Sequence, residues 1–552
     1  MKSIVFFIIF LIPSLCYPQS IKYEVGAYGL LSPDSEVMPH WLIFNRNGIF
    51  DGNRNEFLTY LDINYENTWG KKWKIEAGIQ GINKYPVSAS VLQEAYINLS
   101  YGKFKLIAGQ QEMSLLDDHH TLSSGSFLFS QNARPVPKIG LGFYEYVDVP
   151  FTQGYVQVRG FINQGILNDD RSPRGTDKPL LHEKSAYIRS NKLIVNPYFG
   201  INHSALFGGT RPDGTKIPVD YLSTVFFRGS QKVGEEFPGE GTNAAGAHQG
   251  MFDFGLYFDV KDIHVRFFYQ KPVKDGSGYI GIFRKNKDVI TGVSLKNINS
   301  RLIREFLFER VKTDWQSGPG VHDPIFYGND WYYRTITDYE GFLQEYYGID
   351  APGVTKDEFW RMIRRMDNYG YEYGGRDNYY NNGLYYKGWS HHNYAMGNSF
   401  LLTKDRIHQF NPDFDGSFDY YFANTRVRAY HFGVSGKFHS NLDYRIKFSI
   451  VENLGTYFGL NRGAVNWDSM DPFSDYQYYF SNPQYVDKGL DQYYSMLETV
   501  YTLPKKPELK INLSLGIDTK DLYDNYGFLL GVSYSGEVKK KKNFPETSLV
   551  HN

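Results

Sequence analysis

Residues 441–450, NLDYRIKFSI, alternate between apolar and polar side chains without a break. The apolar positions are Leu442, Tyr444, Ile446, Phe448 and Ile450, and the polar ones are Asp443, Arg445, Lys447 and Ser449. Successive side chains of a strand point to opposite faces, so this stretch predicts a strand with one apolar and one charged face. Either the apolar face packs on a soluble core, or it meets lipid while the charged face meets an aqueous lumen.

The same alternation recurs in segments of about ten residues, a spacing typical of transmembrane strands. Examples lie within 61–65, 73–79, 95–99, 156–162, 263–270, 509–517 and 528–534. Aromatic residues make up 17% of the chain and there are 54 glycines, a composition that favours strands and turns over helices.

The N-terminus, MKSIVFFIIFLIPSLCYPQS, has a short positive region followed by an apolar one. This pattern predicts a secretory signal peptide over 1–16, with cleavage between residues 16 and 20. Beyond residue 20 no stretch approaches the ~18 consecutive apolar residues of a membrane helix. Cys16 is the single cysteine, so a mature chain without it has no disulfide framework and no thiolate site.

The connections between predicted strands fall into two classes. Very short turns are expected at 69–71, 101–103, 260–262 and 439–441, and long connections around 209–246, 312–397 and 454–490. Outer-membrane barrels combine short periplasmic turns with long external loops, and bacterial ones close with an even number of strands. We therefore predict an all-β fold: an up-and-down antiparallel transmembrane barrel of about 18 strands over 21–538, with a polar tail over 539–552.

Two segments do not read as strands. Residues 33–55, which include MPHWLI, are expected either to fold into the lumen or to form a small periplasmic element. In the long connection, Thr355 and Glu358 have the spacing of a capping box, followed by an apolar helical face. A short helix is predicted near 356–368.

Charge and motifs exclude several functions. Lys and Arg total 59 against 60 Asp and Glu, which argues against general nucleic-acid binding. No phosphate loop, dinucleotide fingerprint or nucleophile elbow is present, so no enzyme activity and no cofactor are predicted. The pair His391-His392 could suggest a metal site, but adjacent residues of an extended chain point to opposite sides, so none is predicted.

One cluster combines flat aromatic rings with polar side chains in the long connection. Its members are Trp331, Tyr332, Arg376, Asp377, Asn378, Tyr379, Tyr380 and Trp389. Carbohydrates present apolar C–H faces beside hydroxyl edges, which rings and polar groups together can match. We predict that this cluster binds polysaccharide; the alternative is that the rings form an interfacial girdle or pack the loop.

Several stretches, taken in order, resemble the Wzi family of capsule assembly proteins: EYVDVPFTQGYVQV at 145–158, LHEK at 181–184, Asn202-His203 and the 376–389 cluster. The resemblance spans roughly 25–535. Its motif residues, for which we expect a structural role, are Asp148, Pro150, Phe151, Thr152, Gly154, His182, Glu183, Asn202 and His203. Of these, Asp148, Asn202 and His203 are expected to hold a luminal hydrogen-bond network.

The resemblance implies a monomeric outer-membrane barrel that anchors capsular polysaccharide like a lectin, without catalysis. The partners expected are therefore membrane lipid and surface polysaccharide, and no nucleic acid. The alternative is a porin or polysaccharide-export channel. The side chains predicted to face the lumen carry both signs, and they either cross-link a plugged barrel or line a wet pore. They include Arg159, Arg266, Asp443, Arg445 and Lys447.

Overall fold

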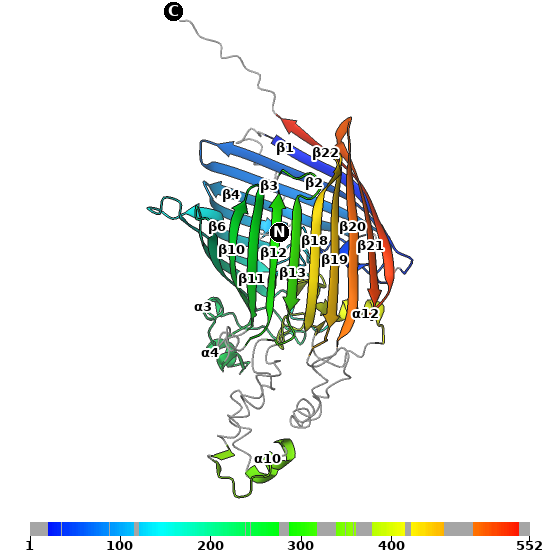
Figure 1. Cartoon of the computed structure of the whole chain (residues 1–552). Coiled ribbons are helices and arrows are strands. Elements are labelled where there is room, and N and C mark those ends of the chain that lie inside the picture. The colour runs from blue at the N-terminus through cyan, green and yellow to red at the C-terminus, as the bar shows by residue number, and fades with distance from the viewer. Residues whose placement is uncertain are drawn as a thin grey trace, which may run out of the picture.

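The structure is a computed structural model of the 552-residue chain, and it forms a closed β-barrel (Figure 1). It describes residues 20–34, 36–87, 89–114, 121–237, 239–242, 244–274, 286–297, 299–316, 338–347, 349–356, 358–359, 378–413, 421–456 and 489–539. The predicted signal peptide and all but the first residue of the predicted tail lie outside these ranges, as do Trp331, Tyr332, Arg376 and Asp377. No helix in the described ranges is long and apolar enough to cross a membrane.

The wall is one 18-stranded antiparallel sheet, as the alternation predicted. Its strands are β1 (Ser20–Leu31), β2 (Glu56–Trp69), β3 (Trp73–Tyr85), β4 (Ala89–Tyr101), β5 (Phe104–Gln110), β6 (Lys138–Asp148), β7 (Val156–Ile166), β8 (Leu180–Ser190), β9 (Asn196–Phe207), β10 (Ala247–Val260), β11 (Ile263–Val273), β12 (Val289–Asn297), β13 (Glu305–Lys312), β18 (Val427–His439), β19 (Leu442–Asn453), β20 (Leu490–Leu503), β21 (Lys506–Lys520) and β22 (Asn525–Lys539). β1 pairs with β22 from Ser20↔Lys539 to Leu31↔Phe528, which closes the barrel. A closed sheet leaves no unpaired edge to face lipid.

The apolar side chains of strand β19 point away from the lumen, toward the surface that would meet lipid. Ile446, Phe448 and Ile450 are exposed on the outer surface, where they join an apolar belt formed by the other strands. On the inner face Ser449 accepts a hydrogen bond from Trp41 Nε1 at 3.0 Å, which fixes the direction of each alternate residue. The outer surface of the wall is therefore the lipid-facing one, and the protein is an integral outer-membrane barrel.

The two ends of the barrel differ in the length of their connections, as predicted from the sequence. One end carries short turns, with aromatic residues close by; Trp69 and Trp73, for example, stack with ring centroids 5.9 Å apart. Such rings mark a membrane interface. The other end carries the long connections, among them 208–246, 313–426 and 454–489. By the rule for outer-membrane barrels the short-turn end is periplasmic and the long-connection end lies outside.

The helices are short and belong to the connections, not to the wall. They are α2 (His40–Ile43), α3 (Tyr221–Val225), α4 (Gln231–Gly234), α5 (Gly239–Thr242), α10 (Tyr339–Tyr347) and α12 (Lys404–Phe410). Two small hairpins, β14 (Ser390–His391) with β15 (Tyr394–Ala395) and β16 (Leu402–Thr403) with β17 (Phe422–Asn424), lie in the 313–426 connection. The predicted capping box is present, since Glu358 N donates to Thr355 Oγ1 at 3.3 Å and Thr355 N donates to Glu358 Oε2 at 3.0 Å. The predicted helix beyond residue 359 lies outside the described residues.

The lumen contains a plug, which we define as residues 32–55, 121–137, 378–413 and 421–426. Most of its buried apolar side chains form one cluster with inward-facing residues of the wall, and Leu402, Ile407 and Ala423 form a second, smaller one. Residues 33–55 thus fold into the lumen, one of the two arrangements expected for them. Gly516 of β21 lets α2 approach closely, because a Cβ at this position would lie only 2.7 Å from Leu42 Cγ.

Hydrogen bonds join the plug to the wall at several heights. Ser123 Oγ of the plug donates to Glu309 Oε1 of β13 at 2.7 Å. Within the plug itself, Trp389 Nε1 donates to Leu128 O at 3.1 Å. His40 N donates to Asp518 Oδ2 of β21 at 2.7 Å. Because these polar groups are buried, losing either partner of such a bond costs about 1–3 kcal/mol.

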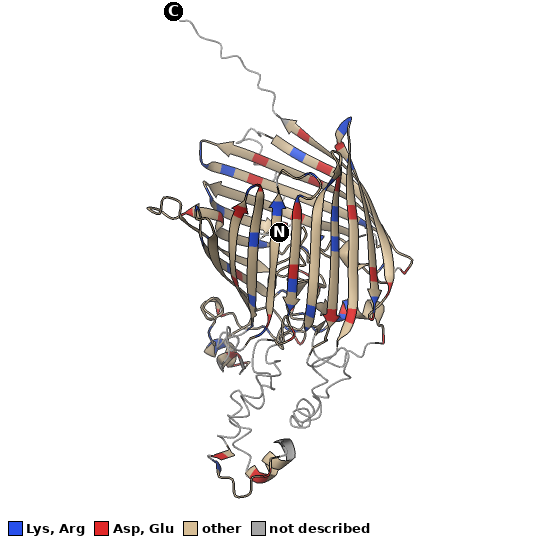
Figure 2. Ribbon diagram, viewed as in Figure 1, with Lys and Arg blue, Asp and Glu red and all other residues tan. Residues whose placement is uncertain are grey.

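Charged residues recur along the strands (Figure 2). The contacts of those predicted to face the lumen lie on the inner face. Arg445 lies 2.6 Å from Glu498, which also pairs with Arg46 of the plug at 2.6 Å. Lys447 is buried, with its ammonium 4.4 Å from the centre of the Trp41 ring. The mixed charges therefore cross-link wall and plug in this part of the barrel.

Toward the short-turn end the surroundings of the inward-facing charges range from partly exposed, at Asp443, to buried, at Arg159. Asp443 lies 3.0 Å from Lys437, and both side chains are partly exposed. Arg159 lies over the ring of Tyr187 with 4.5 Å to the centroid, and Arg266 donates to Tyr198 Oη at 2.7 Å.

Candidate functional site

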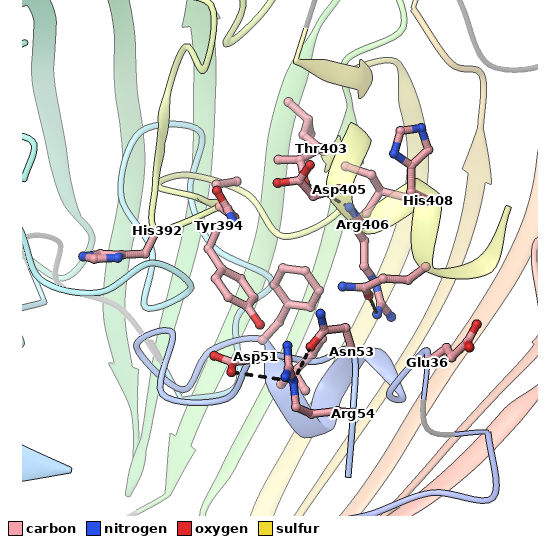
Figure 3. A pocket seen from close by; sticks show the side chains of 17 residues that line it. Glu36, Asp51, Asn53, Arg54, His392, Tyr394, Thr403, Asp405, Arg406 and His408 are labelled. Atoms are coloured by element: carbon pink, nitrogen blue, oxygen red, sulfur yellow. Dashed lines mark hydrogen bonds and ion pairs between the residues drawn. The ribbon is translucent and has the colours of Figure 1, made fainter. Parts of the chain in front are cut away.

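A polar pocket of about 620 Å³ lies between the first plug segment and residues 392–409 (Figure 3). Helix α12, which forms one side of it, lies at the long-connection end of the barrel (Figure 1). The pocket is therefore on the outer side of the plug. Its lining includes Glu36, Asp51, Asn53, Arg54, His392, Asn393, Tyr394, Thr403, Asp405, Arg406, His408 and Gln409.

Each side of the pocket is held by contacts to the rest of the plug or wall. Tyr394 Oη donates to Phe50 O at 2.6 Å, which fixes the tyrosine ring against the first segment. Arg406 donates to Met38 O at 2.7 Å and to Tyr523 Oη at 2.8 Å. Thr403 caps α12 by accepting from Arg406 N. These contacts prepare the pocket before any ligand arrives, which lowers the cost of binding.

Several side chains at the pocket keep free surface for a ligand. Asn53, Asp405 and His408 are exposed, and Arg54 is partly exposed with Nε 3.0 Å from Asn53 Oδ1. Asp405 accepts from Tyr421 Oη at 2.7 Å. Amide, carboxylate, guanidinium and imidazole groups around the rings of Phe44 and Tyr394 supply both donors and acceptors, as hydroxyl-rich ligands require.

The two histidines have different roles, because His391 lies in β14 while His392 begins the following turn with a positive φ of 49°. His391 is buried, with Nδ1 2.9 Å from Arg134 O and Nε2 3.0 Å from Asn168 Oδ1. His392 instead lines the pocket. Burial lowers the pKa of His391 to about 4, and burial with the neighbouring His391 lowers the pKa of His392 to about 3. Both rings are therefore neutral near pH 7.

A buried ion pair supports this part of the plug. Arg171 lies 3.3 Å from Asp169, and both side chains are almost fully buried. Burial opposes the charge of Asp169, but the nearby Arg171 outweighs it and holds the pKa of the carboxyl below its ordinary value. Arg171 also donates to Ser390 O at 2.9 Å and Gly388 O at 3.1 Å, so the pair positions the chain that leads to His392.

The predicted aromatic cluster does not form this pocket. Tyr379, Tyr380 and Trp389 are only 0%, 1% and 2% exposed, because they pack in the interior of the plug. Their polar atoms are satisfied there: Tyr379 Oη donates to Asp288 Oδ2 at 2.7 Å and Tyr380 Oη to Phe127 O at 2.5 Å. The prediction that these three rings contact a ligand directly is therefore wrong. They pack the interior of the plug instead. Trp389 also borders a small cavity of about 70 Å³.

Asn378 belongs to the same packed region, where its carbonyl oxygen accepts from Lys274 Nζ at 2.7 Å. The pocket residues were missed because they come from segments some 350 positions apart, none with a local motif. The only signals in the sequence were the apolar run MPHWLI and the pair His391-His392, which was set aside as a poor metal site. Among the residues that the structure describes, no group of three or more His, Cys, Asp or Glu side chains could hold a metal ion.

The most specific motif forms the turn between β6 and β7, at the short-turn end. Thr152 Oγ1 donates to Val149 O at 2.8 Å, Gln157 Nε2 donates to the exposed Asp148 at 2.7 Å, and Gly154 has a positive φ of 77°. Pro150 and the fully exposed Phe151 lie in the same turn. Gln157 Oε1 in turn accepts from Arg189 Nε on the inner face at 2.8 Å, so Asp148 belongs to a chain of hydrogen bonds at the short-turn end of the lumen, in agreement with the network predicted for it.

Asn202 and His203 point to opposite faces of β9, because they are neighbours on one strand. Asn202 faces the lumen, where it donates to Tyr187 Oη at 2.8 Å and accepts from Ser185 Oγ at 2.8 Å. His203 lies on the outer face, beside His248 and Phe227, so its predicted luminal role is wrong. In β8, Glu183 faces inward and lies 2.8 Å from Lys138, while His182 faces outward.

The fold and the pocket together define an outer-membrane β-barrel with a filled lumen and a polar site on its outer side. Residues 42–357, more than half of the chain, match the model of the family described as capsule assembly protein Wzi. The chain belongs to this family, in agreement with the resemblance seen in its motifs.

Solved structures support the fold. The chain is similar to Wzi of Escherichia coli, which is described as an outer membrane protein involved in group 1 capsule assembly and a carbohydrate binding β-barrel. The TM-score is 0.51 at 12% identity, and the match covers 98% of this chain and 88% of that one. No curated protein matched the chain.

Weaker likenesses extend to OccK5 (OpdH) and OccK3 (OpdO) of Pseudomonas aeruginosa, with TM-scores of 0.44 and 0.43 at 8% and 9% identity. They cover 94% of this chain and 98% and 96% of their own. Likeness at this level supports no conclusion about function.

Proposed function

We propose that this chain binds surface polysaccharide in the pocket on the outer side of its plug and takes part in capsule assembly as a monomer. The observation that carries the proposal is a preformed polar pocket that also contains the rings of Phe44 and Tyr394, placed at the external end of a filled barrel. Family membership agrees with it. The packed plug favours binding over conduction, and the absence of any recognisable catalytic order favours binding over hydrolysis.

The pocket offers the chemistry that sugars need. The ring of Tyr394 supplies an apolar face, while Asn53, Arg54, Asp405 and His408 supply donors and acceptors around it. Trp331, Tyr332, Arg376 and Asp377, which lie outside the described residues, remain additional candidates for the same role.

The proposal is tested with the double variant Asn53→Ala/His408→Ala, because both side chains are exposed and the fold does not depend on them. Binding of purified full-length protein to immobilised capsular polysaccharide should weaken about tenfold, since two neutral hydrogen bonds contribute about 0.5–1.5 kcal/mol each. Asp213→Asn, in the 208–246 connection, is the matched control and should bind normally. Unchanged binding by the folded double variant excludes this pocket, and Trp331→Ala then tests the alternative.

The channel alternative is tested separately in planar lipid bilayers. A filled lumen predicts no sustained current from the unaltered protein. A stable open-channel conductance would contradict the binding role and favour transport.

A further inference from the structure

Residues 219–227, in the connection between β9 and β10, pack against the outside of the barrel wall. The ring of Phe227 lies 4.6 Å from that of His248 and 5.4 Å from that of His203, and Tyr221 lies 6.2 Å from His182. The three histidines are buried although they face outward, since their sequence neighbours Glu183, Asn202 and Gln249 face the lumen. This segment therefore covers part of the outer surface.

The covered surface is a polar strip on β8, β9 and β10. It consists of His182, Lys184, His203 and His248, and Lys184 Nζ donates to Val225 O in the covering segment. A further hydrogen bond joins His203 Nε2 and His248 Nδ1 at 2.9 Å. Left bare at the height of the membrane, such groups would face hydrocarbon, where each unsatisfied polar group costs several kcal/mol.

The strip lies directly at the edge of the apolar belt. On the same strands and on the same outer face, Ile188, Ile201 and Leu256 follow it toward the short-turn end, and all three are exposed. The covering segment thus begins where the lipid-facing surface would otherwise turn polar. Its place beside the wall is seen at α3 in Figure 1.

The outward surface of residues 219–227 is itself largely apolar. Leu222 is 64% exposed and Phe226 is 60% exposed, with Val219 and Tyr221 exposed beside them. Exposed apolar patches mark contacts with other surfaces, and a short amphipathic element at a membrane boundary lies with its apolar side in the lipid. This exposed patch continues the apolar belt of the barrel wall. The same membrane lipid can therefore contact both surfaces.

We propose that residues 219–227 form a lipid-contacting collar, which covers the polar strip of β8–β10 and inserts Leu222 and Phe226 into the outer leaflet. The collar extends the lipid-facing surface of the barrel outward on one side only. Its occupant is the acyl and headgroup boundary of the membrane, not a second protein.

The collar is tested with a fluorescent label in the full-length protein. Cys16→Ser removes the single native cysteine, and Leu222→Cys or Phe226→Cys then carries an environment-sensitive fluorophore. Leu530→Cys in the belt is the positive control, and Asp213→Cys in the same connection is the aqueous control. The labelled proteins are folded into phosphatidylcholine–phosphatidylglycerol vesicles with or without spin-labelled phosphatidylcholine.

Labels at 222 and 226 should show blue-shifted emission and be quenched by spin-labelled lipid as strongly as the label at 530, while that at 213 is unaffected. Heat-modifiable gel mobility verifies that each variant is folded. Emission and quenching at both positions equal to those at 213 would overturn the collar. Concentration-dependent cross-linking through Leu222→Cys, with no quenching, would also overturn it, because a second copy would then cover the patch.

Discussion

Strand β19 passes through two environments inside one barrel. Near the short-turn end, Asp443 pairs with Lys437 where both side chains are partly exposed. Farther along, Lys447 and Ser449 are buried against Trp41 of the plug. The inward-facing polar residues of β19 thus lie in a wetter region near one end of the strand and in a packed region near the other. The difference teaches that the plug, not the strand, decides what an inward polar residue does.

The largest effect should follow from breaking the packed region. Trp41→Ala removes a buried ring that contacts Lys447 and donates to Ser449, so we expect a loss of about 3–5 kcal/mol in the free energy of unfolding. It should also admit ions, which planar-bilayer recording would detect as a new conductance. Trp69→Ala, at the exposed girdle, is the control and should not conduct. A variant as stable and as closed as the unaltered protein would show that Trp41 does not hold the plug.

Acid should loosen the plug next most strongly. The pKa of buried His391 is about 4 in the folded state against an ordinary 6.5, so between these values the unfolded chain binds more protons. Its contribution is therefore complete above pH 6.5 and is lost as the pH falls toward 4, by roughly 3 kcal/mol at most. Denaturant midpoints across this range would measure the slope. His391→Asn should flatten it, whereas His408→Asn, at an exposed position, should not.

A smaller loss is expected at the boundary between the two regions. Glu498→Gln leaves Arg46 and Arg445 partly buried without their carboxylate, at a cost of about 2 kcal/mol. The comparison is Glu66→Gln, whose pair with Lys74 at 3.2 Å is exposed and should contribute under about 0.5 kcal/mol. Equal losses in urea unfolding would mean that the plug does not strengthen the inner ion pairs.

The smallest effect belongs to the wetter region. Arg189 lies 3.7 Å from the centre of the Tyr146 ring. Arg189→Lys keeps the charge but loses the planar stacking, so about 0.5–1 kcal/mol should be lost in the same unfolding assay. A loss as large as that of Trp41→Ala would contradict the distinction between the two regions.

The sequence alone was sufficient for the wall. Alternation has a period of two in every strand, and it assigns Ile446 to lipid and Arg445 to the lumen without knowledge of any partner. The two classes of connection likewise predicted which end faces outward. These features are local, so each can be found within a dozen residues.

The plug and the pocket were beyond prediction for a physical reason. Tyr and Trp satisfy buried polar groups and also stack on sugars, so the composition around Tyr379, Tyr380 and Trp389 fits both roles. Only their burial in the structure separates the two. The pocket itself joins Arg54 with Asp405 across most of the chain, a contact that depends on how the plug packs inside a finished barrel.

The position of α2 has a consequence for how the barrel is assembled. Its segment is tethered to β1 on one side and β2 on the other, yet it rests on β20, β21 and β22. Helix α2 is therefore made together with β1 and β2, and it provides the internal surface on which β20, β21 and β22 pack. Pairing of β22 with β1 and docking on α2 join the same two ends of the chain, one by backbone hydrogen bonds and the other by side-chain packing. The helix therefore adds side-chain packing on the inside of the closing seam, beyond the backbone pairing and the Tyr23–Tyr534 ring contact of β1 and β22.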